Sequence, residues 1–266
     1  MAAVLEAITV SKLYPKRRGL LQRWSGAIRA VDQVSCALEP GDAVGLVGES
    51  GCGKTTLAKL LMGLLTPSDG EVRVHGVPLG RLRGGALKAS KRVVQCIFQD
   101  PLNSLNPRMT VEEILSEPLL IHRLASGGAR RKRIEELLET VGLPAAYSRR
   151  LPRELSGGER QRVGIARALA LEPEALICDE PIASLDLSVG VRILELLRAI
   201  RRERRMALLF ISHDLRAVAW LCERIAVMRD GRLLDVAPTE ELIRHPRHPY
   251  TELLIRAAAL DLDASP

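Results

Sequence analysis

Residues 48–55 have the sequence Gly48-Glu49-Ser50-Gly51-Cys52-Gly53-Lys54-Thr55, which fits the phosphate-loop pattern G-x-x-x-x-G-K-[ST]. The apolar segment before it, Asp42–Val47, predicts a buried strand, and Thr56–Met62 after it predicts a helix. A glycine loop between a strand and a helix N-terminus points backbone N–H groups and the helix dipole at phosphate. A chance glycine-rich turn is the alternative, which this setting disfavours. The sequence therefore predicts a nucleoside triphosphate site.

The side chains of this loop predict separate roles. Lys54 can reach the β- and γ-phosphates of a nucleotide, and the Thr55 hydroxyl can ligate Mg²⁺. Cys52 lies beside a helix N-terminus, which predicts a lowered thiol pKa and a reactive thiolate. We expect ATP to be bound by the whole loop, that is by Gly48, Glu49, Ser50, Gly51, Cys52, Gly53, Lys54, Thr55 and Thr56.

The composition predicts one large α/β domain without a membrane span. The chain has 266 residues, of which 47% are hydrophobic, enough for one large core. No stretch approaches the roughly 18 uninterrupted apolar residues that cross a bilayer. Met1–Glu6 lacks the basic and apolar regions of a secretory signal. The five cysteines form no C-x-x-C pair, which disfavours a zinc site or a disulfide framework and suits a reducing cytoplasm.

The net charge of +7 is spread over several basic clusters. They are Lys16–Arg18, Arg130–Arg133, Arg149–Arg150 and Arg201–Arg205. Such clusters can bind nucleic acid or anionic lipid. Acidic residues lie near most of them, and few aromatic residues are available to stack on bases. A solvated, arginine-rich face is therefore favoured over a nucleic-acid site, although charge alone does not decide.

Apolar patterns divide the chain into two α/β parts around a helical middle. Strands are predicted within residues 4–47 and at 71–75, 93–98, 175–178 and 207–211. Helices are predicted between about 110 and 171, and from about 191 to 202. The middle segment thus has the pattern of a helical insertion between two halves of an α/β core.

A second glycine-containing motif, Leu155-Ser156-Gly157-Gly158-Glu159-Arg160-Gln161-Arg162, precedes a predicted helix. Ser156 is the expected N-cap of that helix. The motif fits an ordinary capped helix. It also fits an anion site, in which a hydroxyl, free N–H groups and the helix dipole face outward. The motif by itself does not separate these alternatives.

Two carboxylates end the predicted strand at 175–178. In a phosphate-loop ATPase the carboxylate at such a strand end holds Mg²⁺, a role that we assign to Asp179. Glu180 is then placed to orient and polarise the attacking water. A solvated acidic turn is the alternative, and the phosphate loop favours the catalytic interpretation.

Six motifs occur in one order along the chain. They are the phosphate loop, Phe98-Gln99-Asp100, Leu155–Glu159, Asp179-Glu180-Pro181, Ser184-Leu185-Asp186 and Ser212-His213-Asp214. In this order they resemble the ATP-binding-cassette (ABC) ATPases, from about Val4 to Thr251. The resemblance implies an α/β fold, with a P-loop NTPase core, an N-terminal antiparallel β subdomain and a helical signature subdomain at about 108–172. It implies one ABC ATPase domain at 4–255, followed by a tail at 256–266.

The resemblance also implies roles for further residues. Gln99 would be the Q-loop glutamine that senses Mg²⁺ and water, and His213 the switch histidine that contacts the γ-phosphate. Asp186 would belong to the D-loop at a dimer interface. Tyr14 matches the position where the family stacks an aromatic ring on adenine, with a packed surface tyrosine as the alternative.

The family mechanism implied by this likeness requires two cassettes. Two subunits face each other head to tail and enclose two ATP molecules. Each site would take Lys54, Thr55, Asp179, Glu180 and His213 from one subunit. The partner would supply the signature turn, which consists of Ser156, Gly157 and Gly158. ATP binds the closed state better than the open one, so hydrolysis opens the dimer.

A narrower likeness is to the ATPase subunits of dipeptide, oligopeptide and nickel importers. It rests on Phe98–Thr110, Ile114–Leu119, His245–Thr251 and the long stretch between Tyr14 and Ala30. This likeness implies membrane permease subunits as partners, a second and different ATPase subunit, and a substrate-binding protein that acts indirectly outside the membrane. It places the chain on the cytoplasmic face of the membrane, without a nucleic-acid partner. The cargo, peptide or nickel, stays open because this subunit does not touch it.

A soluble cassette ATPase acting on nucleic acid or ribosomes is the second hypothesis. The basic clusters would then be its contact surface. Such relatives usually have a long coiled coil or two cassettes in one chain, and this sequence has one cassette and no long heptad run. The sequence therefore favours the importer subunit.

Overall fold

The computed structural model describes residues 3–18, 23–98 and 105–258. Its centre is a sheet in which β3, the strand before the phosphate loop, pairs in parallel with β8 on one side and β9 on the other. The strand order is β10-β9-β3-β8-β7-β6, and only the β9–β10 pair is antiparallel. The strands are β3 (Ala43–Val47), β6 (Val94–Ile97), β7 (Ala175–Asp179), β8 (Ala207–Ile211), β9 (Arg224–Arg229) and β10 (Arg232–Pro238).

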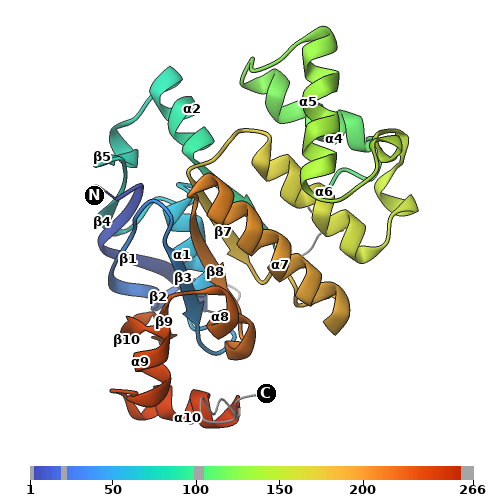
Figure 1. Cartoon of the computed structure of the whole chain (residues 1–266). Coiled ribbons are helices and arrows are strands. Elements are labelled where there is room, and N and C mark those ends of the chain that lie inside the picture. The colour runs from blue at the N-terminus through green and yellow to red at the C-terminus, as the bar shows by residue number, and fades with distance from the viewer. Residues whose placement is uncertain (1–2, 19–22, 99–104, 259–266) are drawn as a thin grey trace.

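A second, antiparallel sheet lies beside the central one (Figure 1). Its order is β2-β1-β4-β5, and the two long strands β1 and β2 form a hairpin. The strands are β1 (Leu5–Arg18), β2 (Arg23–Leu38), β4 (Asp69–Val74) and β5 (Val77–Pro78). The N-terminal antiparallel sheet implied by the family resemblance is therefore present.

The helices occupy three regions of the molecule (Figure 1). Those associated with the sheets are α1 (Lys54–Leu61), η1 (Leu79–Arg81), α2 (Gly84–Val93), α7 (Leu187–Arg204) and α8 (Leu215–Leu221). A helical part contains α4 (Val111–Ile121), α5 (Gly127–Thr140), η2 (Ala145–Arg149), η3 (Pro152–Glu154) and α6 (Gly157–Leu169). The chain then ends with α9 (Thr239–Arg244) and α10 (Pro249–Ala257).

The central strands are apolar along their length because both faces of the sheet are covered. Every residue of β3, β7 and β8 is buried. Successive side chains of a strand point to opposite faces, so these strands contribute to two cores. One core includes Cys178, Leu208 and Phe210 together with residues of α4 to α8. The other includes Ile177 and Leu209, which pack with α1 and the antiparallel sheet. This two-sided burial fixes the strand ends from which the functional loops leave.

The predicted strands and helices are confirmed, with small differences at their ends. Val93 was expected to open a strand, but it is the last residue of α2, and β6 begins at Val94. Helix α7 starts at Leu187, several residues before the expected start near Val191. Within the described ranges, no helix is both long and apolar enough to cross a membrane.

Candidate functional site

The backbone of the phosphate loop lies directly against two neighbouring strands. A Cβ atom on Gly53 would lie 2.2 Å from the carbonyl oxygen of Ala30 in β2. A Cβ atom on Gly48 would lie 2.1 Å from the carbonyl oxygen of Met228 in β9. Gly53 also has a φ of +114°, a conformation that side chains disfavour. Gly48 and Gly53 are therefore required by the packing of the loop as well as by its shape.

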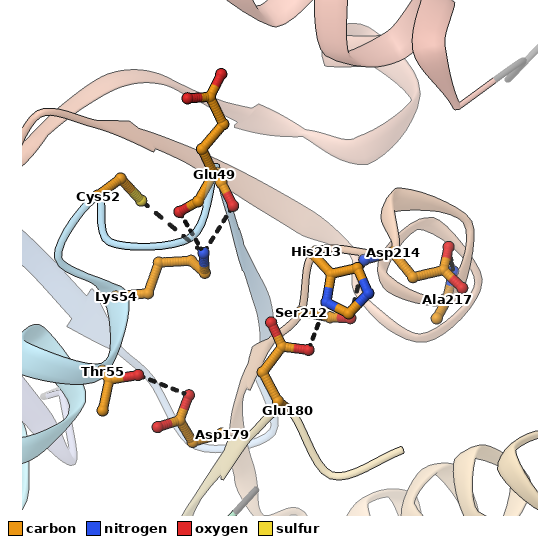
Figure 2. Close-up of polar contacts among 11 residues, drawn as sticks. Glu49, Cys52, Lys54, Thr55, Asp179, Glu180, Ser212, His213, Asp214 and Ala217 are labelled. Atoms are coloured by element: carbon orange, nitrogen blue, oxygen red, sulfur yellow. Dashed lines mark hydrogen bonds and ion pairs between the residues drawn. The ribbon is translucent and has the colours of Figure 1, made fainter. Parts of the chain in front are cut away.

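The side chain of Lys54 folds back toward the first residues of the phosphate loop. Its side chain is buried, and the ammonium group donates hydrogen bonds to the carbonyl oxygens of Gly48 (2.6 Å) and Glu49 (2.9 Å). Figure 2 shows this ammonium enclosed by the loop, with the Glu49 carboxylate pointing away from it. The positive charge thus lies inside the concave face of the loop, where an anionic phosphate would meet it.

The expected low pKa of Cys52 is wrong for this structure. The side chain is buried, and burial raises the pKa of the thiol above its ordinary value. The nearby Lys54 ammonium and backbone N–H groups favour the thiolate, but desolvation outweighs them. The sequence showed the helix N-terminus but not the burial, and burial decides the direction of the shift.

The end of β7 brings a carboxylate to the first turn of α1. The Thr55 hydroxyl donates a hydrogen bond to Asp179 Oδ1 at 3.3 Å (Figure 2). Burial raises the pKa of Asp179, and the adjacent Glu180 carboxylate adds to the rise, while the Thr55 hydrogen bond, Lys54 and Lys59 oppose it. A hydroxyl and a carboxylate are the hard oxygen donors that Mg²⁺ prefers. The pair predicted as metal ligands is thus in contact and has suitable chemistry.

Glu180 lies next to Asp179 but contacts a different partner. Its Oε2 is 2.8 Å from Nδ1 of His213 (Figure 2), and the Glu180 carboxylate is largely buried whereas the imidazole is mostly exposed. Its backbone N–H donates to Ile211 of β8 at 2.9 Å, and its φ is +51°. This left-handed conformation is uncommon for a residue with a side chain. The two consecutive carboxylates therefore have different partners: Asp179 contacts Thr55, and Glu180 contacts His213.

The signature turn is a capped helix start, as predicted. Ser156 Oγ accepts from the Glu159 N–H at 3.3 Å, and Glu159 Oε2 accepts from the Ser156 N–H at 2.7 Å. This reciprocal pair is a capping box. A Cβ on Gly158 would lie 2.5 Å from Val189 Cγ1 of α7, so a glycine is needed there for packing. Within the described residues, no hydrogen bond joins this turn to the phosphate loop.

The remaining predicted residues lie in different surroundings. Asp186 precedes α7 and lines, with His213 and Trp220, a cavity of about 470 Å³. Tyr14 is on β1, exposed, with the Lys12 ammonium 5.7 Å from its ring centre. Its stacking on adenine stays a prediction. Gln99 lies outside the described residues, so its two predicted roles also stay predictions.

One contact to the phosphate loop was not predicted from the sequence. The phenolic oxygen of Tyr250 in α10 accepts a hydrogen bond from the backbone N–H of Glu49 at 3.1 Å. In the sequence, the segment His245–Thr251 indicates only a likeness to the importer ATPase subunits. No spacing rule connects it to a loop 201 residues earlier, so only the fold could reveal the contact.

Comparisons with known proteins agree with this geometry. Residues 31–183 match the family model for the ABC transporter family. The chain is 44% identical to a probable peptide ABC transporter ATP-binding protein, y4tS, of Sinorhizobium fredii, covering 96% of this chain and 72% of that protein. It is 47% identical to the oligopeptide transport ATP-binding protein OppF of Bacillus subtilis, covering 88% and 78%. The solved structure of the cassette MJ0796, dimeric and bound to ADP and phosphate, is similar with a TM-score of 0.77 and 30% identity, covering 88% of this chain and 98% of that one.

The burial of the cysteines generates a prediction about thiol reactivity. Removal from water raises the pKa of Cys36 to about 11 and that of Cys96 to about 12, and the pKa values of Cys52, Cys178 and Cys222 are raised as well. Since the thiolate is the reactive form, we expect the folded protein to react slowly with a maleimide at pH 7. The rate should rise about tenfold per pH unit between pH 7 and 9, as the thiolate fraction does below the pKa.

Mass spectrometry of labelled peptides measures this rate, with urea-unfolded protein as the control in which all five cysteines react quickly. Rapid labelling of Cys52 in the folded protein at pH 7, prevented by MgATP, would show that its thiol is exposed and ionised after all.

Proposed function

This chain belongs to the ABC transporter family, and we propose that it is the ATP-hydrolysing subunit of a peptide importer. As a member of that family the chain binds ATP and is an ATPase. One observation carries the assignment of the site: the Thr55–Asp179 contact joins the phosphate loop to a strand end 124 residues away. Similarity to y4tS and OppF over most of both chains supports peptide as the cargo. Nickel has no such support from these relatives.

Lys54 is the residue proposed to change partners when ATP binds. In this structure, its ammonium group donates hydrogen bonds to the carbonyl oxygens of Gly48 and Glu49. The β- and γ-phosphates are stronger acceptors because they are charged, so Lys54 would turn toward them. The N–H groups of the loop and the N-terminus of α1 would bind the remaining phosphate oxygens.

Mg²⁺ is proposed to be held by Thr55 and Asp179. The fit rests on the contact between the two oxygens and on the raised pKa of Asp179, whose buried charge lacks full compensation. Mg²⁺ would take its other ligands from phosphate oxygens and water. When bound, it neutralises part of the charge on the phosphates. Gln99 is proposed as a further contact on the sequence motif alone.

Glu180 is proposed as the residue that polarises the attacking water. Its carboxylate is largely shielded from solvent and lies 2.8 Å from His213 Nδ1. This contact limits the orientations of both side chains. The exposed imidazole would then contact the γ-phosphate, while Glu180 accepts the proton that the water loses during attack.

A complete site is proposed to need a second cassette. The signature turn of this chain begins α6, in the helical part, whereas the phosphate loop precedes α1 (Figure 1). Ser156, Gly157 and Gly158 would therefore face the nucleotide of a partner subunit, with Asp186 at the interface. We propose that the partner is a different ATPase subunit, that both bind membrane permease subunits at the cytoplasmic face, and that a substrate-binding protein supplies the peptide.

Isolation of the protein from its native membranes tests this function. We expect a tagged chain to copurify with integral-membrane permease subunits, and peptide uptake by whole cells to be lost when the chain is deleted. Recovery of RNA or ribosomal proteins in place of a membrane protein would contradict the proposal and favour the soluble cassette ATPase. The Lys54→Ala variant controls for association that depends on nucleotide.

Substitution of Glu180 tests the catalytic assignment. Glu180→Gln should keep ATP binding but lower the rate of hydrolysis by about 10²–10⁴-fold, the usual contribution of a positioned base. Phosphate release in steady state, with nucleotide binding measured separately, gives both quantities. Glu174→Gln is the matched control, because Glu174 precedes the opposite end of β7. Near-normal turnover by Glu180→Gln would remove Glu180 from this role.

Mixing two inactive variants tests whether the partner is a paralogue. Lys54→Ala disables the phosphate-loop half of a site, and Ser156→Arg disables the signature half. For an obligate heterodimer we expect the mixture to stay as inactive as either variant, since the two never face each other. Each variant alone is the control. Clear recovery of ATPase activity in the mixture, without a second ATPase present, would establish a homodimer.

A further inference from the structure

Helix α10 is attached to the phosphate loop by one buried side chain. Tyr250 is almost fully buried, and its phenolic oxygen accepts the Glu49 N–H at 3.1 Å. Glu49 is the second residue of the loop. Glu49 itself is exposed and this hydrogen bond is partly buried, so its N–H is partly withdrawn from water and is stabilised by an acceptor from the protein. Tyr250 supplies that acceptor from outside the nucleotide motif.

Several interactions hold the Tyr250 ring in position. The Arg229 guanidinium lies over the ring, 4.6 Å from its centre. Helix α10 begins at Pro249, and His248 Nδ1 accepts from the Tyr250 N–H at 3.0 Å. Before the helix, the Arg247 N–H donates to the buried Asp235 at 3.0 Å. These contacts hold the Tyr250 ring and backbone, so the phenolic oxygen has a fixed position beside the loop.

The hydrogen bond between Glu49 and Tyr250 does not involve Lys54. It would therefore remain when the Lys54 ammonium moves from the carbonyl oxygens to phosphate. In this structure Glu49 is held on both sides, by Tyr250 at its N–H and by the Lys54 ammonium and the Cys52 N–H at its carbonyl oxygen. Movement of Lys54 toward phosphate would remove one of these. The Tyr250 hydrogen bond would then keep the first half of the loop in its present conformation.

The other end of α10 is attached to the segment that follows His213. Arg216 Nε donates to the carbonyl oxygen of Ala258 at 2.8 Å. A cavity of about 430 Å³ lies between these parts, and it is lined by Glu49, His213, Arg216 and Leu254 among others. Helix α10 therefore contacts both the phosphate loop and the region of the predicted switch histidine.

We propose that Tyr250 is a positioning residue that holds the phosphate loop ready for nucleotide. The inference rests on the proposed role of this loop in ATP binding. A loop that is already ordered loses less conformational entropy when the ligand binds. Since the phosphates contact the loop both before and during the reaction, the benefit applies equally to the ground and transition states. Loss of Tyr250 should therefore raise KM and leave kcat unchanged.

Tyr250→Phe tests the proposal because it removes only the hydroxyl group. In the chain purified together with its partner subunits, we expect KM for ATP, and the dissociation constant of ATP, to rise about two- to tenfold, which corresponds to the net value of one hydrogen bond. The value of kcat should stay within about twofold. Thr251→Val is the matched control: the adjacent Thr251 is fully buried, and its hydroxyl has no hydrogen-bond partner within the described residues. It should leave KM unchanged.

Hydrogen exchange of the Glu49 amide provides a second measurement. In nucleotide-free wild-type protein this amide should be protected, and Tyr250→Phe should reduce the protection whereas Thr251→Val should not. An unprotected Glu49 amide in the wild type would overturn the proposal even if Tyr250→Phe does not fold.

Two kinetic outcomes would also overturn the proposal. One is an unchanged KM in folded Tyr250→Phe, which would leave Tyr250 a purely structural residue. The other is a fall in kcat alone, which would place its effect on the chemical step. Failure of the proposed function is distinguishable, because the tagged chain would then copurify with no permease subunit, whereas protection of the Glu49 amide reports on the Tyr250 contact alone.

Discussion

The ammonium group of Lys54 is the centre around which the site is arranged. A buried cation is costly unless it is paired or hydrogen-bonded. Here two carbonyl oxygens of its own loop accept hydrogen bonds from the ammonium group. The loop can enclose the cation because Gly48 and Gly53 lie directly against the backbones of β9 and β2. Without this confinement the same sequence would be a flexible glycine-rich turn. The packing of the sheets thus maintains the electrostatic character of the loop.

The two consecutive carboxylates at the end of β7 make two different contacts. Asp179 lies within β7 and contacts Thr55, whereas Glu180 follows in a left-handed conformation and contacts His213. Burial raises the pKa of Asp179, so its ionised form is less favourable in the nucleotide-free protein than in water. A cation bound beside it would reverse that imbalance. This is the charge balance expected of the metal ligand that we propose Asp179 to be.

The sequence predicted the central strands and the capped helices because local signals specify them. Continuous apolar runs identified β3, β7 and β8, and Ser156 followed by two glycines identified the start of α6. It did not predict the direction of the Cys52 pKa shift. A motif shows the helix N-terminus beside the thiol, but desolvation depends on residues that the fold brings in from elsewhere. No prediction covered β9, β10 or helices α8 to α10.

The contact between Tyr250 and Glu49 depends on the topology of the sheet and on the helices that follow it. Strand β9 pairs in parallel with β3, with Val227 opposite Val47, so the chain leaves β9 at the same edge where the phosphate loop begins. Strand β10 returns antiparallel to β9, and α9 and α10 follow. Arg229, the last residue of β9, then stacks on the Tyr250 ring. The parallel pairing places Arg229 near the loop, and β10 carries the chain back to the opposite edge, where Pro238 pairs with Arg224. The segment through α9 then returns it to Arg229 and Glu49. The motifs identify the residues that we propose carry the chemistry, whereas the fold determines which residues support them.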